Sequence, residues 1–108
     1  MKKMILSMSL LVSVSLYAAD KVECEELFWS ATYNFYLENA CKYDKNISVP
    51  ISKMFEKKGC STVFNENDIK RVTNAVLGST YKEMNETGRE KFCKEKKITY
   101  DELKKMYL

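Results

Sequence analysis

The stretch Cys24–Cys41, CEELFWSATYNFYLENAC, decides the fold of this chain. Just before it, Asp20 with Glu23 resembles an N-terminal cap with its reciprocal acid. Apolar residues then recur at helical spacing along two adjoining lines: Cys24, Phe28, Ala31 and Phe35 on one, and Trp29, Tyr33, Tyr36 and Ala40 on the other. The pattern predicts a helix over about residues 21–43, and its broad aromatic arc predicts that the other helices pack around it.

Four cysteines, Cys24, Cys41, Cys60 and Cys93, predict two disulfides, because an even count in a small exported domain is typical of a disulfide framework. Cys24 and Cys41 lie at opposite ends of the predicted helix, about 25 Å apart at 1.5 Å per residue, and cannot bond to each other. If the next helix folds back along the first, Cys24 pairs with Cys60 and Cys41 pairs with Cys93. The pairing of Cys24 with Cys93 and of Cys41 with Cys60 remains the alternative.

A second helix is predicted over about residues 49–58. Ser48 is its expected cap, and Pro50 falls in the first turn, where the missing N–H costs nothing. Gly59 is the expected stop signal.

The rest of the chain also shows helical patterns. A third helix begins after Asn65 and fades near residue 85. Two hydroxyl-x-x-acid patterns then predict a helix over about 88–97 and a short final one; these are Thr87 with Glu90 and Thr99 with Glu102. No segment alternates with period two, as a strand on a sheet surface would. The sequence therefore predicts an all-α fold, a compact bundle of four to five helices stapled by two disulfides.

The N-terminal 18 residues read as a secretory signal peptide. Lys2 and Lys3 precede an apolar run over residues 4–16, and Ala18 supplies a small residue for cleavage. An uncleaved membrane anchor is the alternative, but about 13 apolar-biased residues fall short of the roughly 20 that cross a bilayer. We expect residues 19–108 to form a single helical domain in the periplasm.

Charge and composition exclude several classes of function for that domain. Removing residues 1–18 leaves 108 − 18 = 90 residues and, with two lysines fewer, a net charge of 16 − 15 = +1. A near-neutral domain has no long-range field that would attract nucleic acid. The chain has no histidine, no Gly-rich phosphate loop and no Cys-x-x-Cys pair, and its cysteines are too far apart for a zinc cluster. We therefore expect no catalytic activity, no metal and no cofactor.

Two stretches carry the N-glycosylation pattern Asn-x-Ser/Thr, and both have an acid two residues before the asparagine. They are DKNIS, residues 44–48, and EMNET, residues 83–87. The longer pattern resembles the sequon of bacterial periplasmic oligosaccharyltransferases and implies glycan attachment at Asn46 and Asn85. The alternative is that both are ordinary solvated loop residues between helices, with Ser48 and Thr87 acting only as caps.

The leader, the helices and the expected disulfides resemble small periplasmic proteins such as type VI secretion immunity proteins, which bind and block a toxin. The resemblance covers architecture and cysteine usage, and no toxin-binding residue can be carried over. The CEELF start of the first helix is also similar to that of acid-activated periplasmic chaperones, which usually hold one disulfide. A second disulfide here would restrict the partial unfolding that exposes their apolar surface. An accessory subunit of an envelope machine or outer-membrane protein is the third class.

These patterns together favour a module that binds another envelope protein, with a periplasmic stress chaperone as the alternative. The first helix has more large apolar side chains than one face can bury, so some must reach the surface. The expected binding anchors are Trp29, Tyr33 and Tyr36, although packing into the core would account for the same aromatic stripe.

Overall fold

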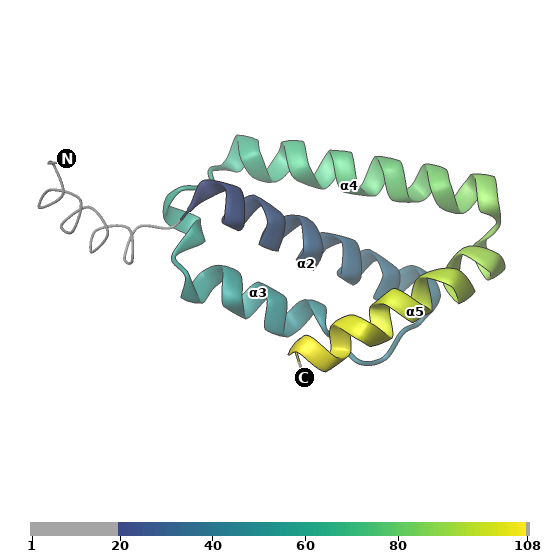
Figure 1. Cartoon of the computed structure of the whole chain (residues 1–108). Helices are drawn as coiled ribbons and strands as arrows, with labels where there is room; N and C mark the ends of the chain where they lie inside the picture. The colour runs from purple at the N-terminus through teal and green to yellow at the C-terminus, as the bar shows by residue number, and fades with distance from the viewer. Residues whose placement is uncertain (1–19, 108) are drawn as a thin grey trace, which may run out of the picture.

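A computed structural model describes residues 20–107, which form four α-helices and one short 3-10 turn and contain no strand (Figure 1). The elements are α2 (Lys21–Cys41), α3 (Ser48–Lys57), η1 (Cys60–Thr62), α4 (Glu66–Thr87) and α5 (Arg89–Tyr107). The all-α prediction is confirmed. The predicted signal peptide, residues 1–18, lies outside the described residues.

Helix α2 is the central element, as its aromatic arc predicted. Helices α3 and α4 flank it on two sides, and α5 crosses its C-terminal half (Figure 1). Helix α4 runs in the same direction as α2, whereas α3 and α5 run back along it (Figure 1). Within residues 20–107, no helix combines the length and the apolar character needed to span a bilayer.

The core consists of two clusters, one at each end of α2. The first surrounds Cys24 and Leu27 of α2 and takes Ile51 from α3, Phe64 from the following loop and Val76 from α4. The second cluster is formed by Leu37, Met84 and Phe92, one residue from each of α2, α4 and α5. Each cluster therefore joins α2 to neighbours that are distant in sequence.

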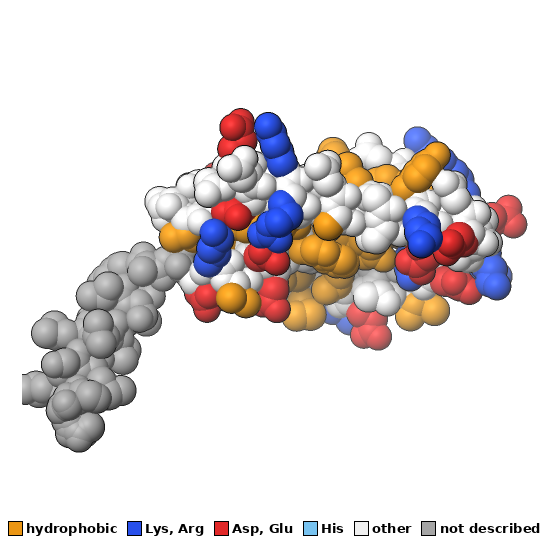
Figure 2. Space-filling model, turned by 90° about the horizontal axis from the view of Figure 1, so that it is seen from above, with side chains coloured by type: hydrophobic (Ala, Val, Ile, Leu, Met, Phe, Trp, Pro, Cys, Tyr) orange, Lys and Arg blue, Asp and Glu red, His pale blue; other side chains and the backbone are white. Residues whose placement is uncertain are grey.

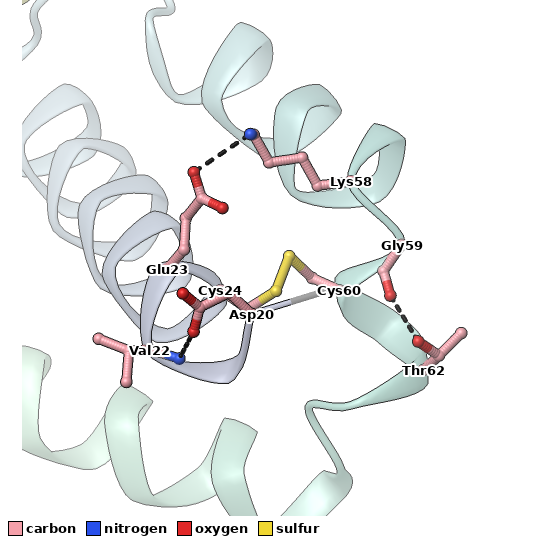
Figure 3. The surroundings of a disulfide bond; sticks show 8 residues. All are labelled: Asp20, Val22, Glu23, Cys24, Lys58, Gly59, Cys60 and Thr62. Atoms are coloured by element: carbon pink, nitrogen blue, oxygen red, sulfur yellow. Dashed lines mark hydrogen bonds and ion pairs between the residues drawn. A yellow bond between two sulfur atoms is a disulfide. The ribbon is translucent and has the colours of Figure 1, made fainter. Parts of the chain in front are cut away.

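Both disulfides form with the pairing that the helix geometry favoured. Cys24 bonds to Cys60 with a Cα–Cα distance of 5.5 Å, and Cys41 bonds to Cys93 with a distance of 5.4 Å. Figure 3 shows the first bond, which ties the start of α2 to the turn that follows α3. Helix α3 returns the chain along α2, which brings Cys60 back to Cys24 as predicted.

The predicted cap at the start of α2 is confirmed in part, and α4 begins after Asn65 as predicted. The Asp20 carboxylate accepts a hydrogen bond from the Val22 N–H at 2.9 Å, but Glu23 pairs with Lys58 at 3.1 Å (Figure 3). The expected reciprocal bond from Glu23 was therefore wrong, because the neighbouring α3 terminus offers that carboxylate a cation. At α4, the side chain of Asn65 caps the helix in a full capping box.

Three predicted hydroxyl caps are wrong. Helix α3 begins at Ser48 itself, after Ile47, and the Ser48 hydroxyl points to another helix. Helix α4 continues through Thr87, and Gly88, with φ +95°, makes the break instead. Its N–H donates to Met84 of α4, and its carbonyl accepts from Phe92 of α5.

The third wrong cap is Thr99, because α5 runs unbroken from Arg89 to Tyr107 where two helices were expected. Two interactions favour continuation of the helix through Thr99. Lys97 pairs with Asp101 one turn later at 3.0 Å, and Tyr100 is anchored in the interior. Tertiary burial therefore outweighs the local capping preference of the threonine.

Candidate functional site

An open groove follows one side of α2, between α3 and α4, and has a volume of about 1130 Å³. We call it the α2 groove. Its apolar part is formed by Phe28, Ala31 and Phe35 of α2, Val49 and Phe55 of α3, and Leu77 of α4. None of its lining residues comes from α5. In Figure 2, viewed from above, hydrophobic side chains reach the surface in the middle of the molecule, with many charged side chains toward its ends.

Three large apolar side chains of the groove are exposed to solvent. The exposed fraction is 61% for Phe35, 49% for Val49 and 37% for Leu77. Phe28, on the same line of α2 as Phe35, instead contacts Phe55 and Phe64, with ring centroids 5.7 and 5.3 Å away. An exposed apolar surface rimmed by polar groups is typical of an interaction site.

The sequence did not reveal the exposure of Phe35. Periodicity placed it on the same line as Phe28, since both lie on one stripe of α2. Whether a neighbour covers a residue on that stripe depends on where α3 and α4 lie, and helical spacing carries no information about that.

A network of hydrogen bonds lies at the end of the groove near the C-terminus of α2. The Glu38 carboxylate accepts from the Ser48 hydroxyl at 2.5 Å, from the Ser48 N–H at 3.2 Å and from the Tyr100 hydroxyl at 2.6 Å. It thus joins α2 to the start of α3 and to α5, and explains why Ser48 does not cap its own helix. Burial, and then the bond to Glu38, raise the pKa of the Tyr100 hydroxyl far above its ordinary value.

Tyr43 supports this network from the loop between α2 and α3. Its ring packs on that of Tyr100 with centroids 4.6 Å apart, and its hydroxyl donates to the backbone carbonyl of Cys93. Burial raises the pKa of the Tyr43 hydroxyl. This end of the groove is therefore held by contacts to both α2 and α5.

The three predicted aromatic anchors do not lie together. Trp29 is 43% exposed and stacks on the half-buried Tyr33 with ring centroids 5.0 Å apart, and neither residue lines the α2 groove. Burial raises the pKa of the Tyr33 hydroxyl, and the nearby Lys96 ammonium partly offsets this effect. Tyr36 is half-buried and does line the groove.

The two sequons occupy different environments. Asn46 is exposed in the α2–α3 loop, with φ +53°, and lies at the edge of the α2 groove. Asn85 is also exposed, but it belongs to the last turn of α4, so the expectation that it lies between helices was wrong. The helix extends past it because Met84 is buried in the second core cluster.

Within residues 20–107, no group of three or more histidine, cysteine, aspartate or glutamate side chains is placed to hold a metal ion. All four cysteines there are in disulfides. The groove offers apolar contact with hydrogen-bonding groups at its edge, which suits recognition of another molecule.

Comparison of the chain with protein-family models, with curated proteins and with solved structures finds no match.

Proposed function

We propose that this chain is an exported protein-binding module of the bacterial envelope, which acts by contact and performs no catalysis. The observation that carries the proposal is the exposure of Phe35, Val49 and Leu77 along one groove. These apolar side chains come from three helices, and their exposure to water is unfavourable in free energy. A partner that covered them would remove this apolar surface from water.

The shape of the groove favours a helical segment as the partner. From Phe28 to Asn39 its α2 side spans about 16 Å, at 1.5 Å per residue, or three helical turns. Helices α3 and α4 both pack on α2 and leave the strip between them open. An amphipathic helix with apolar residues at positions i, i+3/i+4 and i+7 would fit that strip and bury Phe35 at its centre.

The charges at the groove favour a partner that binds chiefly through apolar contact. Lys53 and Glu56 lie at its edge and have opposite signs, and Glu38 already accepts hydrogen bonds from Ser48 and Tyr100. The groove therefore has no strong preference for a partner of one charge. Two stapling disulfides reduce the conformational freedom that the module must lose on association.

Export to the periplasm is the second part of the proposal. It is supported by the signal-peptide pattern in residues 1–18 and by the two disulfides, which form and persist in oxidising compartments. Glycan attachment at Asn46 and Asn85 is supported by the acidic sequons, and the exposed side chains of both asparagines leave room for a glycan on the folded domain. An immunity or inhibitor-type protein, or an accessory subunit of an envelope assembly, matches this combination.

Position-specific photo-cross-linking in the native envelope tests the proposal. A photoreactive residue at Val49, in the groove, should yield one discrete adduct, whereas the same residue at Ile98, on α5 and 70% exposed, should not. A broad range of adducts at Val49 would indicate the chaperone alternative. Equal adducts at Val49 and Ile98, or none at Val49, would contradict a binding role for the groove.

A further inference from the structure

The two disulfides lie in contrasting environments. Cys24 and Cys60 are 1% and 0% exposed and belong to the first core cluster. Cys41 and Cys93 are half-buried and line a second cavity of about 340 Å³ at the other end of α2. Cys41 and Cys93 also pack against the second core cluster, but the cavity that they line gives an attacking group an approach to their bond.

This second cavity, which we call the lysine cavity, carries an excess of positive charge. Its charged residues are Lys42, Lys45, Lys94, Lys97, Asp44 and Asp101. Lys97 pairs with Asp101 at 3.0 Å, and Lys45 lies 4.0 Å from Asp44. Among the described residues, Lys42 and Lys94 have no ion-pair partner, and each directly follows one of the two cysteines in sequence.

Positive charge beside a disulfide favours exchange in two ways. It attracts an anionic thiolate to the bond, and it stabilises the thiolate that leaves when the bond breaks. The Cys24–Cys60 bond is buried and so lacks this access, and the ammonium of Lys58 near it is already paired with Glu23. Exchange should therefore be selective for Cys41–Cys93.

We propose that the Cys41–Cys93 disulfide is an exchange site for anionic thiols, meaning small thiols that also carry a carboxylate. In the first step the external thiolate attacks Sγ of Cys41 or Cys93. A mixed disulfide forms, the Cys41–Cys93 bond breaks, and its electron pair leaves on the other protein sulfur as a thiolate. A second external thiolate then attacks the external sulfur of the mixed disulfide, the bond from that sulfur to the protein breaks, and its electron pair leaves on the second protein sulfur as a thiolate. Two external thiols are thus oxidised to one disulfide while the protein bond takes up two electrons.

The fold retains other contacts that hold α5 in place when this bond opens. Arg89 donates to the carbonyl of Ala40 at 2.6 Å, and Lys96 pairs with Glu83 at 2.7 Å. The Tyr100 hydroxyl also donates to Glu38, independently of the disulfide. The reduced form can therefore stay folded, which sets this site apart from a bond whose loss simply unfolds the chain. This property is separate from partner binding in the α2 groove.

Thiol exchange on the oxidised mature chain tests the proposal. Mercaptopropionate, whose thiolate form has two negative charges, is compared with mercaptoethanol at equal thiolate concentration, and free thiols are trapped by alkylation and mapped to peptides. Cys41 and Cys93 should be alkylated well before Cys24 and Cys60, and mercaptopropionate should react several-fold faster. In the Lys42→Gln/Lys94→Gln double variant, the ratio of the mercaptopropionate rate to the mercaptoethanol rate should fall by a factor of roughly two to three for each lysine replaced.

Lys70→Gln is the matched control, because Lys70 is exposed on α4 and does not line the lysine cavity. It should leave the rate ratio of the two thiols unchanged. Alkylation of Cys24 and Cys60 together with, or ahead of, the other pair would overturn the proposal. So would equal rates for the two thiols, or the same rate ratio in the double variant as in the unaltered chain.

Discussion

Glu38 and Tyr100 lie 62 positions apart in the sequence, yet the Tyr100 hydroxyl donates to the Glu38 carboxylate at 2.6 Å. The bond joins α2 to α5 at the edge of the α2 groove, which Glu38 lines. A hydrogen bond to a charged group contributes about 1.5–3 kcal/mol to the free energy of unfolding, and its loss would leave the Glu38 carboxylate without this donor.

Removing the Tyr100 hydroxyl should therefore destabilise the domain. We expect Tyr100→Phe to lower the free energy of unfolding by about 1.5–3 kcal/mol, as measured by urea denaturation. In a Glu38→Gln background the same change should cost less, because the charged acceptor is already gone. Tyr81→Phe is the control, since Tyr81 is exposed. Equal costs in both backgrounds would show that the two residues are not coupled.

Alkaline pH should destabilise the domain through the same tyrosine. Burial and Glu38 raise the pKa of Tyr100, so the folded state favours the protonated hydroxyl. This contribution is fully present below the ordinary tyrosine pKa of about 10 and is lost as the pH rises above that value toward the raised pKa. The free energy of unfolding should therefore fall more steeply above about pH 10 in the unaltered chain than in Tyr100→Phe. A parallel decline in both chains would contradict this assignment.

The buried amide of Asn34 offers a stabilising substitution. Its Nδ2 donates to the Ser30 carbonyl at 2.8 Å, but its buried Oδ1 has no hydrogen-bond partner among the described residues. Because an unsatisfied buried polar atom costs about 1–3 kcal/mol, Asn34→Leu should raise the thermal midpoint. Ser79→Ala, on the exposed side of α4, is expected to change it little. A lower midpoint for Asn34→Leu would mean that its polar contacts outweigh that cost.

The intact mass of the protein from its native host should report glycans at both sequons. Asn46→Gln and Asn85→Gln should each remove one mass increment, whereas Asn74→Gln, an exposed asparagine outside any sequon, should remove none. Transfer should precede folding, because the folded domain engages the Ser48 hydroxyl with Glu38 and holds Asn85 in α4. A bare 19–108 mass, from cells that glycosylate other proteins, would refute both sites.

The disulfide framework could be predicted because it depends on distances along one helix. Cys24 and Cys41 are separated by nearly the full length of α2, and the short α3 returns the chain far enough to reach the first of them. The continuity of α5 through Thr99 could not be predicted in this way. Whether the helix continues there depends on Tyr100, whose burial becomes apparent only when α5 packs on the other helices.

The candidate site was less predictable than the fold. The aromatic stripe correctly indicated that α2 has more large side chains than its neighbours cover. Which residues reach the surface depends on the placement of α3 and α4, so the groove contains Phe35, which was not among the predicted anchors, together with Tyr36, which was. The cluster around Glu38 also escaped prediction, because its members come from three separate elements.

The most direct test of the central claim is the affinity of the purified chain for the partner identified by cross-linking at Val49. Phe35→Asp should weaken binding at least tenfold, since loss of a buried aromatic anchor costs more than about 1.4 kcal/mol. Phe35 is 61% exposed, so the variant should keep its fold and both disulfides. Ile98→Asp places the same charge on exposed α5 and should leave the affinity unchanged. Equal affinities for Phe35→Asp and the unaltered chain would contradict the assignment of the α2 groove as the binding surface.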